Sequence, residues 1–137
     1  MYPRRRFYKG PVTSLAAGKE ERVMFHRGKI CVRQLNLWYD GDDTTGSYSN
    51  IWKIKIDGQE ILNMTLYDIF TCLAGYVSAG HSDRPVVVQV FNNTSKTFGV
   101  IFHDLGVVNE GIEVWFKNVD TSNSCSLIIA MVYDVLE

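Results

Sequence analysis

The chain has 137 residues and no apolar run near the roughly 18–20 residues that a transmembrane helix needs. Its first residues, MYPRRRFYKG, lack the apolar stretch of a secretory signal peptide. The composition is 46% hydrophobic and 21% charged, which excludes a disordered, collagen-like or coiled-coil chain. We therefore expect a single folded domain with one core and no membrane span.

Motifs that carry catalysis are also missing. The three histidines are isolated in the sequence, and no second ligand type lies at metal spacing from any of them. Neither a G-x-S-x-G nucleophile turn nor a glycine-rich phosphate loop occurs. Cys31, Cys72 and Cys125 form no C-x-x-C pair, so we expect three reduced, buried thiols. The sequence thus predicts no enzyme activity and no cofactor.

One acidic segment comes close to a metal motif. In the loop DGDDTTGSYSN (40–50), Asp40, Asp42 and Asp43 are spaced closely enough to suit a hard cation such as calcium. The order of acidic residues in an EF-hand and its closing glutamate are both absent. We expect a solvated turn, with these three carboxylates as weak metal candidates.

The positive charge is concentrated at the N-terminus. Residues 1–33 carry nine Lys or Arg and two Glu, a balance of +7, whereas residues 34–137 have a balance of −8. This split predicts a basic arm and linker (1–19) ahead of a β-sandwich domain (20–137). Residues 11–19, PVTSLAAGK, could be a linker or a first short edge strand. The arm could simply aid solubility, or it could contact nucleic acid or the acidic face of a neighbouring subunit. The candidate contact residues are Arg4, Arg5, Arg6, Phe7, Tyr8 and Lys9.

The pattern of apolar residues predicts an antiparallel all-β fold. Short apolar runs recur at regular spacing and are separated by turn-forming residues, as in a sandwich or barrel. The expected strands are 21–27, 29–39, 51–56, 59–62, 85–91, 97–103, 111–118 and 126–135. A phase slip between Val32 and Leu35 indicates a β-bulge. Asp57-Gly58 predicts a two-residue type I′ hairpin turn.

A single helix is expected over about 65–77. Its apolar residues recur at helical spacing, with Thr65 as a candidate N-cap and Asp68 three residues later. Gly75 and the small residues that follow are expected to end it.

The aromatic residues allow more than one interpretation. Trp38, Tyr39, Tyr48 and Trp52 bracket the 40–50 loop and could form a stacking platform for sugar rings or bases. The favoured interpretation places Trp38 or Tyr39, together with Trp52, in the core of the sandwich, and a contact with another subunit is the third. Trp115 and Phe116 are neighbours on one strand, so one faces outward and is a candidate for cover by a subunit or by the arm.

Hairpins rich in Asn, Ser and Thr connect apolar strands in two segments of the chain, VVVQVFNNTSKTFGVIF and GIEVWFKNVDTSNSCSLIIAMVYDVLE. With the inserted helix and the basic arm, this organisation resembles viral single jelly-roll proteins. The resemblance implies a jelly-roll sandwich of about eight strands, location in a virion after assembly in the host cytoplasm, and subunits that form trimers or pentamers. Because 137 residues is short for a sole coat protein, it implies a minor capsid, vertex (penton) or decoration protein.

Composition also favours an assembly protein that contacts other copies of itself, because the charged fraction is below the roughly 25% of ordinary domains. Contacts with other capsid subunits are what the resemblance implies. The alternative is a monomeric carbohydrate-binding module that uses the aromatic residues around the 40–50 loop. A cupin-type enzyme is a third class, and it lacks clustered metal ligands in this sequence.

Overall fold

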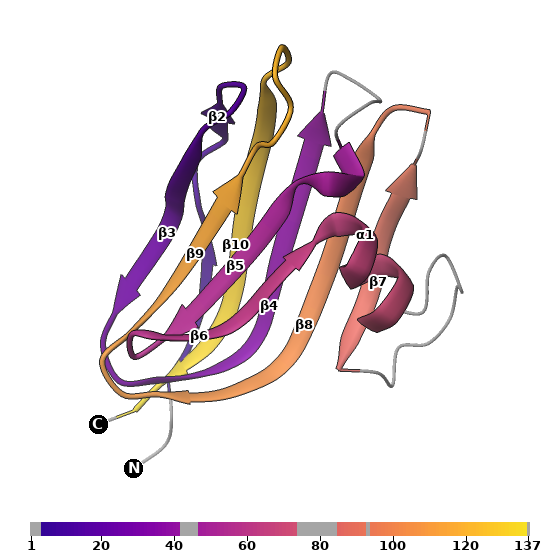
Figure 1. Ribbon diagram of the computed structural model, residues 1–137. Coiled ribbons are helices and arrows are strands. Elements are labelled where there is room, and N and C mark those ends of the chain that lie inside the picture. Colours follow the sequence, from indigo (N-terminus) through magenta and orange to yellow (C-terminus); the bar gives the residue numbers. More distant parts are fainter. Residues whose placement is uncertain (1–3, 42–46, 74–84, 93, 137) are drawn as a thin grey trace.

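Strands make up most of the computed structural model, which describes residues 4–41, 47–73, 85–92 and 94–136 (Figure 1). Ten strands are found within these residues. They are β1 (Arg4–Lys9), β2 (Thr13–Leu15), β3 (Glu20–Arg27), β4 (Ile30–Gly41), β5 (Ile51–Ile56), β6 (Gln59–Thr65), β7 (Val86–Asn92), β8 (Thr97–Val108), β9 (Gly111–Lys117) and β10 (Cys125–Val135). A 3₁₀ turn (Ser47–Ser49) precedes β5.

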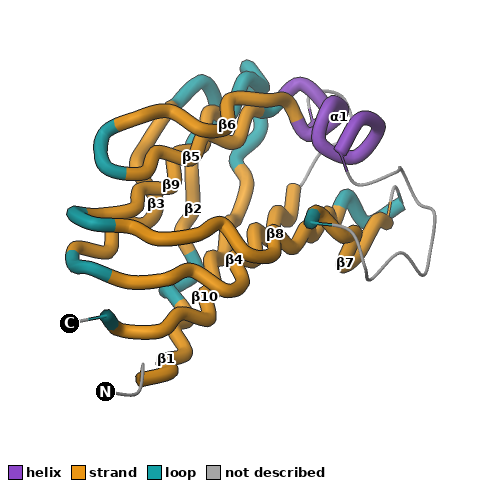
Figure 2. The backbone as a smooth tube through the Cα atoms, turned by 90° about the horizontal axis from the view of Figure 1, so that it is seen from below, coloured by secondary structure: helices purple, strands orange, loops and turns teal. Residues whose placement is uncertain are grey.

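The strands form two antiparallel sheets packed face to face (Figure 2). The six-stranded sheet has the order β1-β10-β4-β8-β7, with β2 also paired to β10; the four-stranded sheet has the order β3-β9-β5-β6. The pairs β2·β10, β3·β9, β4·β8 and β5·β6 describe one long hairpin rolled into two layers, which is the jelly-roll arrangement. The predicted fold class is confirmed, with ten strands rather than about eight.

The two additional strands, β1 and β2, lie in the segment predicted as an arm and linker. Both pair with β10, so residues 4–9 and 13–15 belong to the sandwich rather than preceding it. Backbone hydrogen bonds hold β1, and five of its six side chains are exposed. An alternating apolar pattern is therefore not needed there, and its absence from the sequence concealed the strand.

Two local predictions are confirmed. The register of β4 shifts between Val32 and Gln34 against β10, which makes Arg33 the extra residue of a bulge. The bulge lets Ile30 and Val32 face the core on one side of the slip while Leu35 and Leu37 face it on the other. At the β5–β6 turn, Asp57 and Gly58 have φ of 53° and 81°, as a type I′ turn requires.

The core lies between the sheets and is rich in aromatic rings. Trp52 and Phe116 meet edge-to-face with centroids 4.5 Å apart, and Phe98 packs against Tyr39 and Phe91. All of these side chains except Phe91 are fully or almost fully buried. Cys125 is buried and Cys31 is half-buried, whereas Cys72 is exposed, contrary to expectation.

The helix is shorter than predicted. An α-helical turn α1 (Leu66–Asp68) continues as a π-helical turn (Ile69–Leu73), and residues 74–77 of the predicted range lie outside the described residues. Thr65 is the N-cap, as predicted, and its Oγ1 accepts a hydrogen bond from the Asp68 N–H at 3.1 Å. Phe70 is buried against Phe91 and Phe98, so the helix packs at the β7–β8 side of the sandwich (Figure 2).

Two buried asparagines connect the loops at one end of the sandwich. Asn50 donates to the Tyr39 hydroxyl at 3.1 Å and accepts from the Val119 N–H at 2.8 Å. Asn118 donates to the carbonyls of Asn123, Leu15 and Ala16, and each asparagine is at most 1% exposed. Because buried amides satisfy these backbone groups, the loops have fixed positions.

Candidate functional site

The basic segment forms the edge strand of the six-stranded sheet. β1 pairs with β10 from Arg4 opposite Val135 to Lys9 opposite Ala130. An uncovered β10 would present a row of free N–H and C=O groups, and β1 satisfies them. The sequence-predicted contact residues of this segment are therefore held on an ordered strand.

Asp134 anchors the strand. Its Oδ1 lies 2.9 Å from Arg5 Nε and its Oδ2 lies 2.8 Å from Arg33 Nε, while its own side chain is only 5% exposed. Hydrogen bonds from these two guanidinium groups lower the pKa of Asp134 to about 2. One carboxylate thus serves two arginines, which leaves this end of the sheet positively charged.

The exposed side chains of β1 divide between its two faces. Arg5, Phe7 and Lys9 lie opposite Asp134, Val132 and Ala130 on the side that faces away from the other sheet. Tyr8 lies on the opposite side, where it packs against the core. The Phe7 ring is 79% exposed.

A hollow of about 250 Å³ lies beside Phe7. Its lining residues come from β1, β4 and β10, and they are Phe7, Tyr8, Lys9, Gln34, Asn36, Ala130, Met131 and Val132. Within it, Gln34 Nε2 donates to Asn36 Oδ1 at 2.9 Å. Aromatic, amide and cationic groups therefore share one shallow surface.

The predicted aromatic platform is not assembled on one surface. Tyr39 is 3% exposed and Trp52 is fully buried, so both belong to the core. Tyr48 is half-buried and packs against Phe98 at 5.5 Å. Trp115 lies on the outer side of the four-stranded sheet, with Lys55 Nζ 5.3 Å from its ring centroid. Of the neighbours Trp115 and Phe116, Phe116 is the buried one.

The acidic loop adds no metal site to the described structure. Asp40 is exposed at the end of β4, and Asp42 and Asp43 lie outside the described residues. Within 4–41, 47–73, 85–92 and 94–136, no three His, Cys, Asp or Glu residues gather closely enough to hold a metal ion.

The outer faces of the two sheets differ in chemistry. On the six-stranded sheet, the outward positions at the centre of β10, β4, β8 and β7 include no Asp, Glu, Lys or Arg. We call their apolar members the outer apolar face: Trp38, Val87, Val90, Ile101, Ile128, Ala130 and Val132. The Trp38 ring covers Gly99 of β8, since a Cβ there would come within 3.0 Å of it. Its members are half-buried and lie on four neighbouring strands, with polar residues such as Asn36 and His103 between them.

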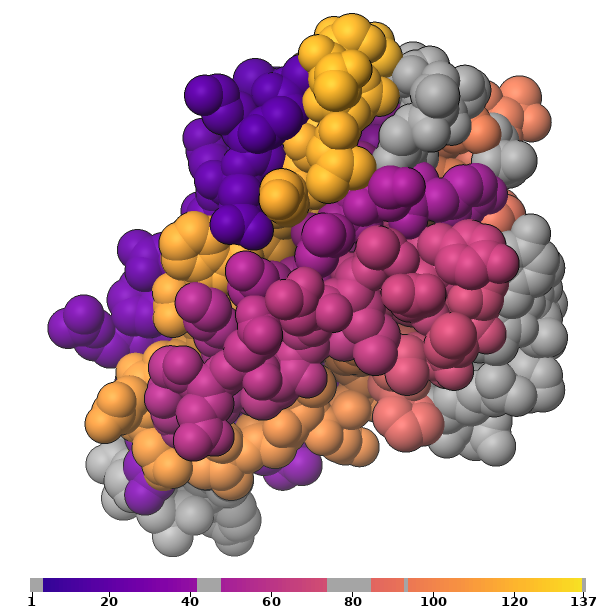
Figure 3. Space-filling view, viewed as in Figure 1, coloured from indigo at the N-terminus to yellow at the C-terminus, as the bar shows by residue number. Residues whose placement is uncertain are grey.

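The outer face of the four-stranded sheet is charged and internally paired. Lys53 Nζ lies 3.5 Å from a Glu20 oxygen and 3.8 Å from a Glu60 oxygen, and Arg22 meets Glu113 at 3.3 Å. Figure 3 shows this side of the molecule, with β5 and β6 across its middle. Exposed ion pairs of this kind are well hydrated and are worth little energetically, so this face suits contact with water.

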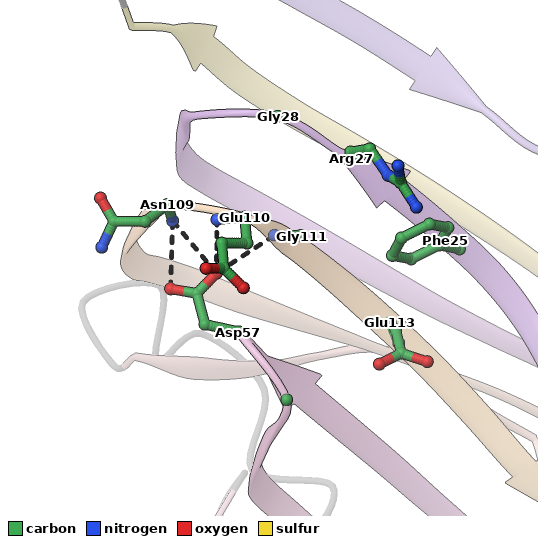
Figure 4. A pocket seen from close by; sticks show the side chains of 9 residues that line it. Phe25, Arg27, Gly28, Asp57, Asn109, Glu110, Gly111 and Glu113 are labelled. Carbon is green, nitrogen blue, oxygen red and sulfur yellow. Dashed lines mark hydrogen bonds between the residues drawn. The ribbon is translucent and has the colours of Figure 1, made fainter.

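A second, larger hollow lies where three hairpins meet (Figure 4). It has a volume of about 560 Å³ and is lined in part by Phe25, Arg27 and Glu113. At its floor the Asp57 carboxylate accepts the N–H groups of Asn109, Glu110 and Gly111 at 2.6–3.2 Å. These hydrogen bonds lower the pKa of Asp57.

Because Asp57 already accepts three backbone N–H groups, it joins the β5–β6 turn to the β8–β9 turn rather than acting as a free acid. The sequence predicted the turn from Asp57-Gly58 but carried no signal for this second contact. Phe25 packs on Gly111, with the Arg22 and Arg27 guanidinium groups 4.6 and 5.6 Å from its ring centroid. The hollow is thus a structural junction.

In the part of the chain that the structure describes, no helix has the length and apolar character needed to cross a bilayer. No protein-family model and no curated protein matches the chain.

Proposed function

We propose that this chain is a structural assembly protein whose copies associate through the outer apolar face. The type of assembly proposed is that of a virion, in which the chain acts as a minor capsid, vertex or decoration subunit beside other capsid proteins. The observation that carries the proposal is the contrast between the two sheets. One outer face has its charges paired in water, and the other is apolar and uncharged at its centre.

Association through this face carries a low desolvation cost. Contiguous exposed apolar patches are uncommon on monomeric proteins, and interface centres are depleted in charged residues. Ile128, Trp38 and Ile101 lie on adjacent strands β10, β4 and β8, so a partner sheet could cover them together. No ion pair has to be broken there, whereas covering the four-stranded sheet would desolvate Lys53, Glu20 and Glu60.

The jelly-roll strand order supports the virion-type proposal at the level of fold alone, because one fold serves many functions. The charge split adds an argument about partner copies. A basic β1 edge on a chain whose residues 34–137 carry a balance of −8 favours contacts between unlike surfaces. Unlike patches close into rings such as the proposed trimer or pentamer.

The test is the mass of the purified chain by light scattering, with Ile128→Lys as the main variant. We expect the mass of the unaltered chain in solution to be a multiple of 15.6 kDa, and the mass of the variant to be that of the 15.6 kDa monomer. The matched control is Ile61→Lys, which adds the same charge at an exposed isoleucine of the other sheet. A monomeric unaltered chain, or equal masses for all three proteins, contradicts the proposal.

Salt dependence separates the two kinds of contact. An assembly held by the outer apolar face keeps its mass at high salt, whereas one held by the basic edge dissociates as charges are screened. Persistence of the mass at high salt therefore indicates contact through the outer apolar face, and dissociation indicates contact through the basic edge. A thermal unfolding curve of Ile128→Lys shows whether the variant is folded.

A further inference from the structure

The ordered basic strand combines cations and an aromatic ring in a way that assembly through the outer apolar face does not use. We define the basic strip as Arg5, Arg6, Phe7 and Lys9 of β1 together with Arg33 of β4. Asp134 is the acidic residue paired with this strip, where it binds both Arg5 and Arg33. The strip therefore keeps a net positive charge after its internal ion pairs are counted.

The order of side chains along one face of β1 is cation, aromatic, cation. Arg5, Phe7 and Lys9 share that face and are about 6.6–6.8 Å apart along the strand, the spacing of alternate strand residues. The 79% exposed Phe7 ring stands between the two charges. The hollow of about 250 Å³ beside it offers the Gln34 and Asn36 amides and the apolar surface of Val132.

We propose that the basic strip binds single-stranded nucleic acid, with one base stacked on Phe7 and the flanking phosphates on Arg5 and Lys9. Proteins that bind single strands combine a basic track with exposed rings on which bases stack. A duplex keeps its base faces covered, so the Phe7 ring selects an unpaired strand. The amides beside the ring can donate to or accept from the edge of the stacked base.

An acidic protein segment is a less suitable occupant. Such a segment would add to the free edge of β1 through backbone hydrogen bonds and would lie in the plane of the sheet. It would leave the outward-facing Phe7 ring and the hollow uncovered. A second copy of β1 paired antiparallel about its centre would place Arg4 opposite Lys9, where like charges are destabilising.

The proposal does not require the proposed assembly function, and the two surfaces adjoin at Ala130 and Val132, which line the hollow. The proposed contact is centred on β10, β4 and β8 around Trp38, whereas the basic strip lies at the β1 edge of the same sheet. A chain that is monomeric can still bind an oligonucleotide, and a chain that assembles can fail to bind one.

The experiment measures fluorescence anisotropy of a labelled oligothymidylate of about 16 nucleotides, a length within the range of known single-strand sites. We expect binding by the full chain that weakens as salt is raised. Phe7→Leu should weaken binding about tenfold without changing the salt dependence, and Phe7→Tyr should retain it. Leucine keeps the apolar bulk and loses the ring, so this pair separates stacking from apolar burial.

Charge is tested by Lys9→Gln, which removes one of the two proposed phosphate contacts and leaves the Arg5–Asp134 anchor in place. Each lost phosphate contact should lower the slope of log affinity against log salt by about 0.7. The matched control is Lys117→Gln, which removes one exposed cation from β9 of the four-stranded sheet. The circular dichroism spectrum and melting curve of each variant confirm that it is folded.

The proposal would be overturned by no binding of the full chain at low salt, by equal affinity for polyglutamate of matched length, or by Phe7→Leu binding as tightly as Phe7→Tyr. Preferential binding of a duplex of the same length would also contradict it. Light scattering on the same samples reports the oligomeric state separately.

Discussion

At the scale of single residues, the structure is held by polar groups whose partners are far away in the sequence. Asp134 meets Arg5 across 129 residues, and Asn118 meets Leu15 across 103. Such groups matter because a buried polar atom that loses its partner costs more than the hydrogen bond contributed. Two of them lead to direct predictions.

Asp134 makes stability sensitive to acid. Its pKa in the folded chain is about 2, against 3.8 ordinarily, so the ionised form is stabilised by folding. This contribution is fully present above about pH 4 and is lost as pH falls towards 2. We expect the urea midpoint of Asp134→Asn to be lower at neutral pH and to fall less steeply with acid.

Asp57 and Asp120 also have lowered pKa values and titrate in the same direction. The difference between the unaltered chain and Asp134→Asn therefore isolates Asp134. Asp40→Asn, at an exposed carboxylate, is the control. Parallel curves for the unaltered chain and Asp134→Asn would mean that Asp134 does not link folding to pH.

Asn118→Ala should lower the free energy of unfolding by about 1–3 kcal/mol, because three carbonyls lose the amide that satisfies them. Equilibrium unfolding in urea measures this loss. Asn63→Ala, at an exposed position of β6, should change the free energy of unfolding by no more than about 0.5 kcal/mol. Equal losses in the two variants would show that burial of the Asn118 amide is not the cause.

At the scale of elements, the positions of turns and edge strands depend on a few specific contacts. The β5–β6 turn is positioned by its own type I′ geometry and by the Asp57 contact to the next hairpin. The β1 strand depends on backbone pairing and one anchor, not on apolar burial. Elements of both kinds are short, and each is tied to one neighbour.

Asp57→Ser tests the connection between turns. Serine is too short to reach all three N–H groups and loses the carboxylate charge, so the β8–β9 turn should open more often. Hydrogen exchange at the amides of Asn109, Glu110 and Gly111 should accelerate selectively. Gly58→Ala is the comparison, because it strains the same turn through its φ of 81° while keeping the Asp57 carboxylate.

Prediction from sequence succeeded where side-chain pattern decides the structure. The β4 bulge, the Asp57-Gly58 turn and the Thr65 cap all depend on residues adjacent in sequence. It failed for β1, whose strand pairing depends on a partner 121 or more residues away. For the aromatic residues, the predicted core placement of Tyr39 and Trp52 is confirmed, and the alternative of a surface platform is wrong, because tertiary packing buries both rings.

The candidate site was only partly accessible from sequence. The basic residues of β1 were visible as a charge cluster, but their arrangement around Phe7 follows from strand alternation in a segment with no strand signal. The outer apolar face was not visible, because residues such as Ile128 and Ile101 look like core residues until the sheet is known. Apolar content alone does not say which side of a sheet is covered.

At the scale of the whole molecule, the two sheets share one core, and large rings fill its centre. Trp52→Ala should cost about 3–5 kcal/mol in the free energy of unfolding, because it leaves a cavity beside Phe116 and Ile54. Calorimetry of Trp52→Ala and of Trp115→Ala measures both losses of stability. Trp115→Ala is the control, because Trp115 is on the outer side of the sheet. Similar losses for both would contradict the placement of Trp52 in the core.

The position of β10 has a consequence for when the fold can form. Its eleven residues are the last strand of the sequence, yet they lie between β1 and β4 and also pair with β2. During synthesis, β1 and β2 are made before their partner, which follows more than 100 residues later. The six-stranded sheet therefore cannot be completed until β10 has been synthesised. Until then, the edge of β4 that pairs with β10 has free backbone groups, which chaperones or other chains can bind.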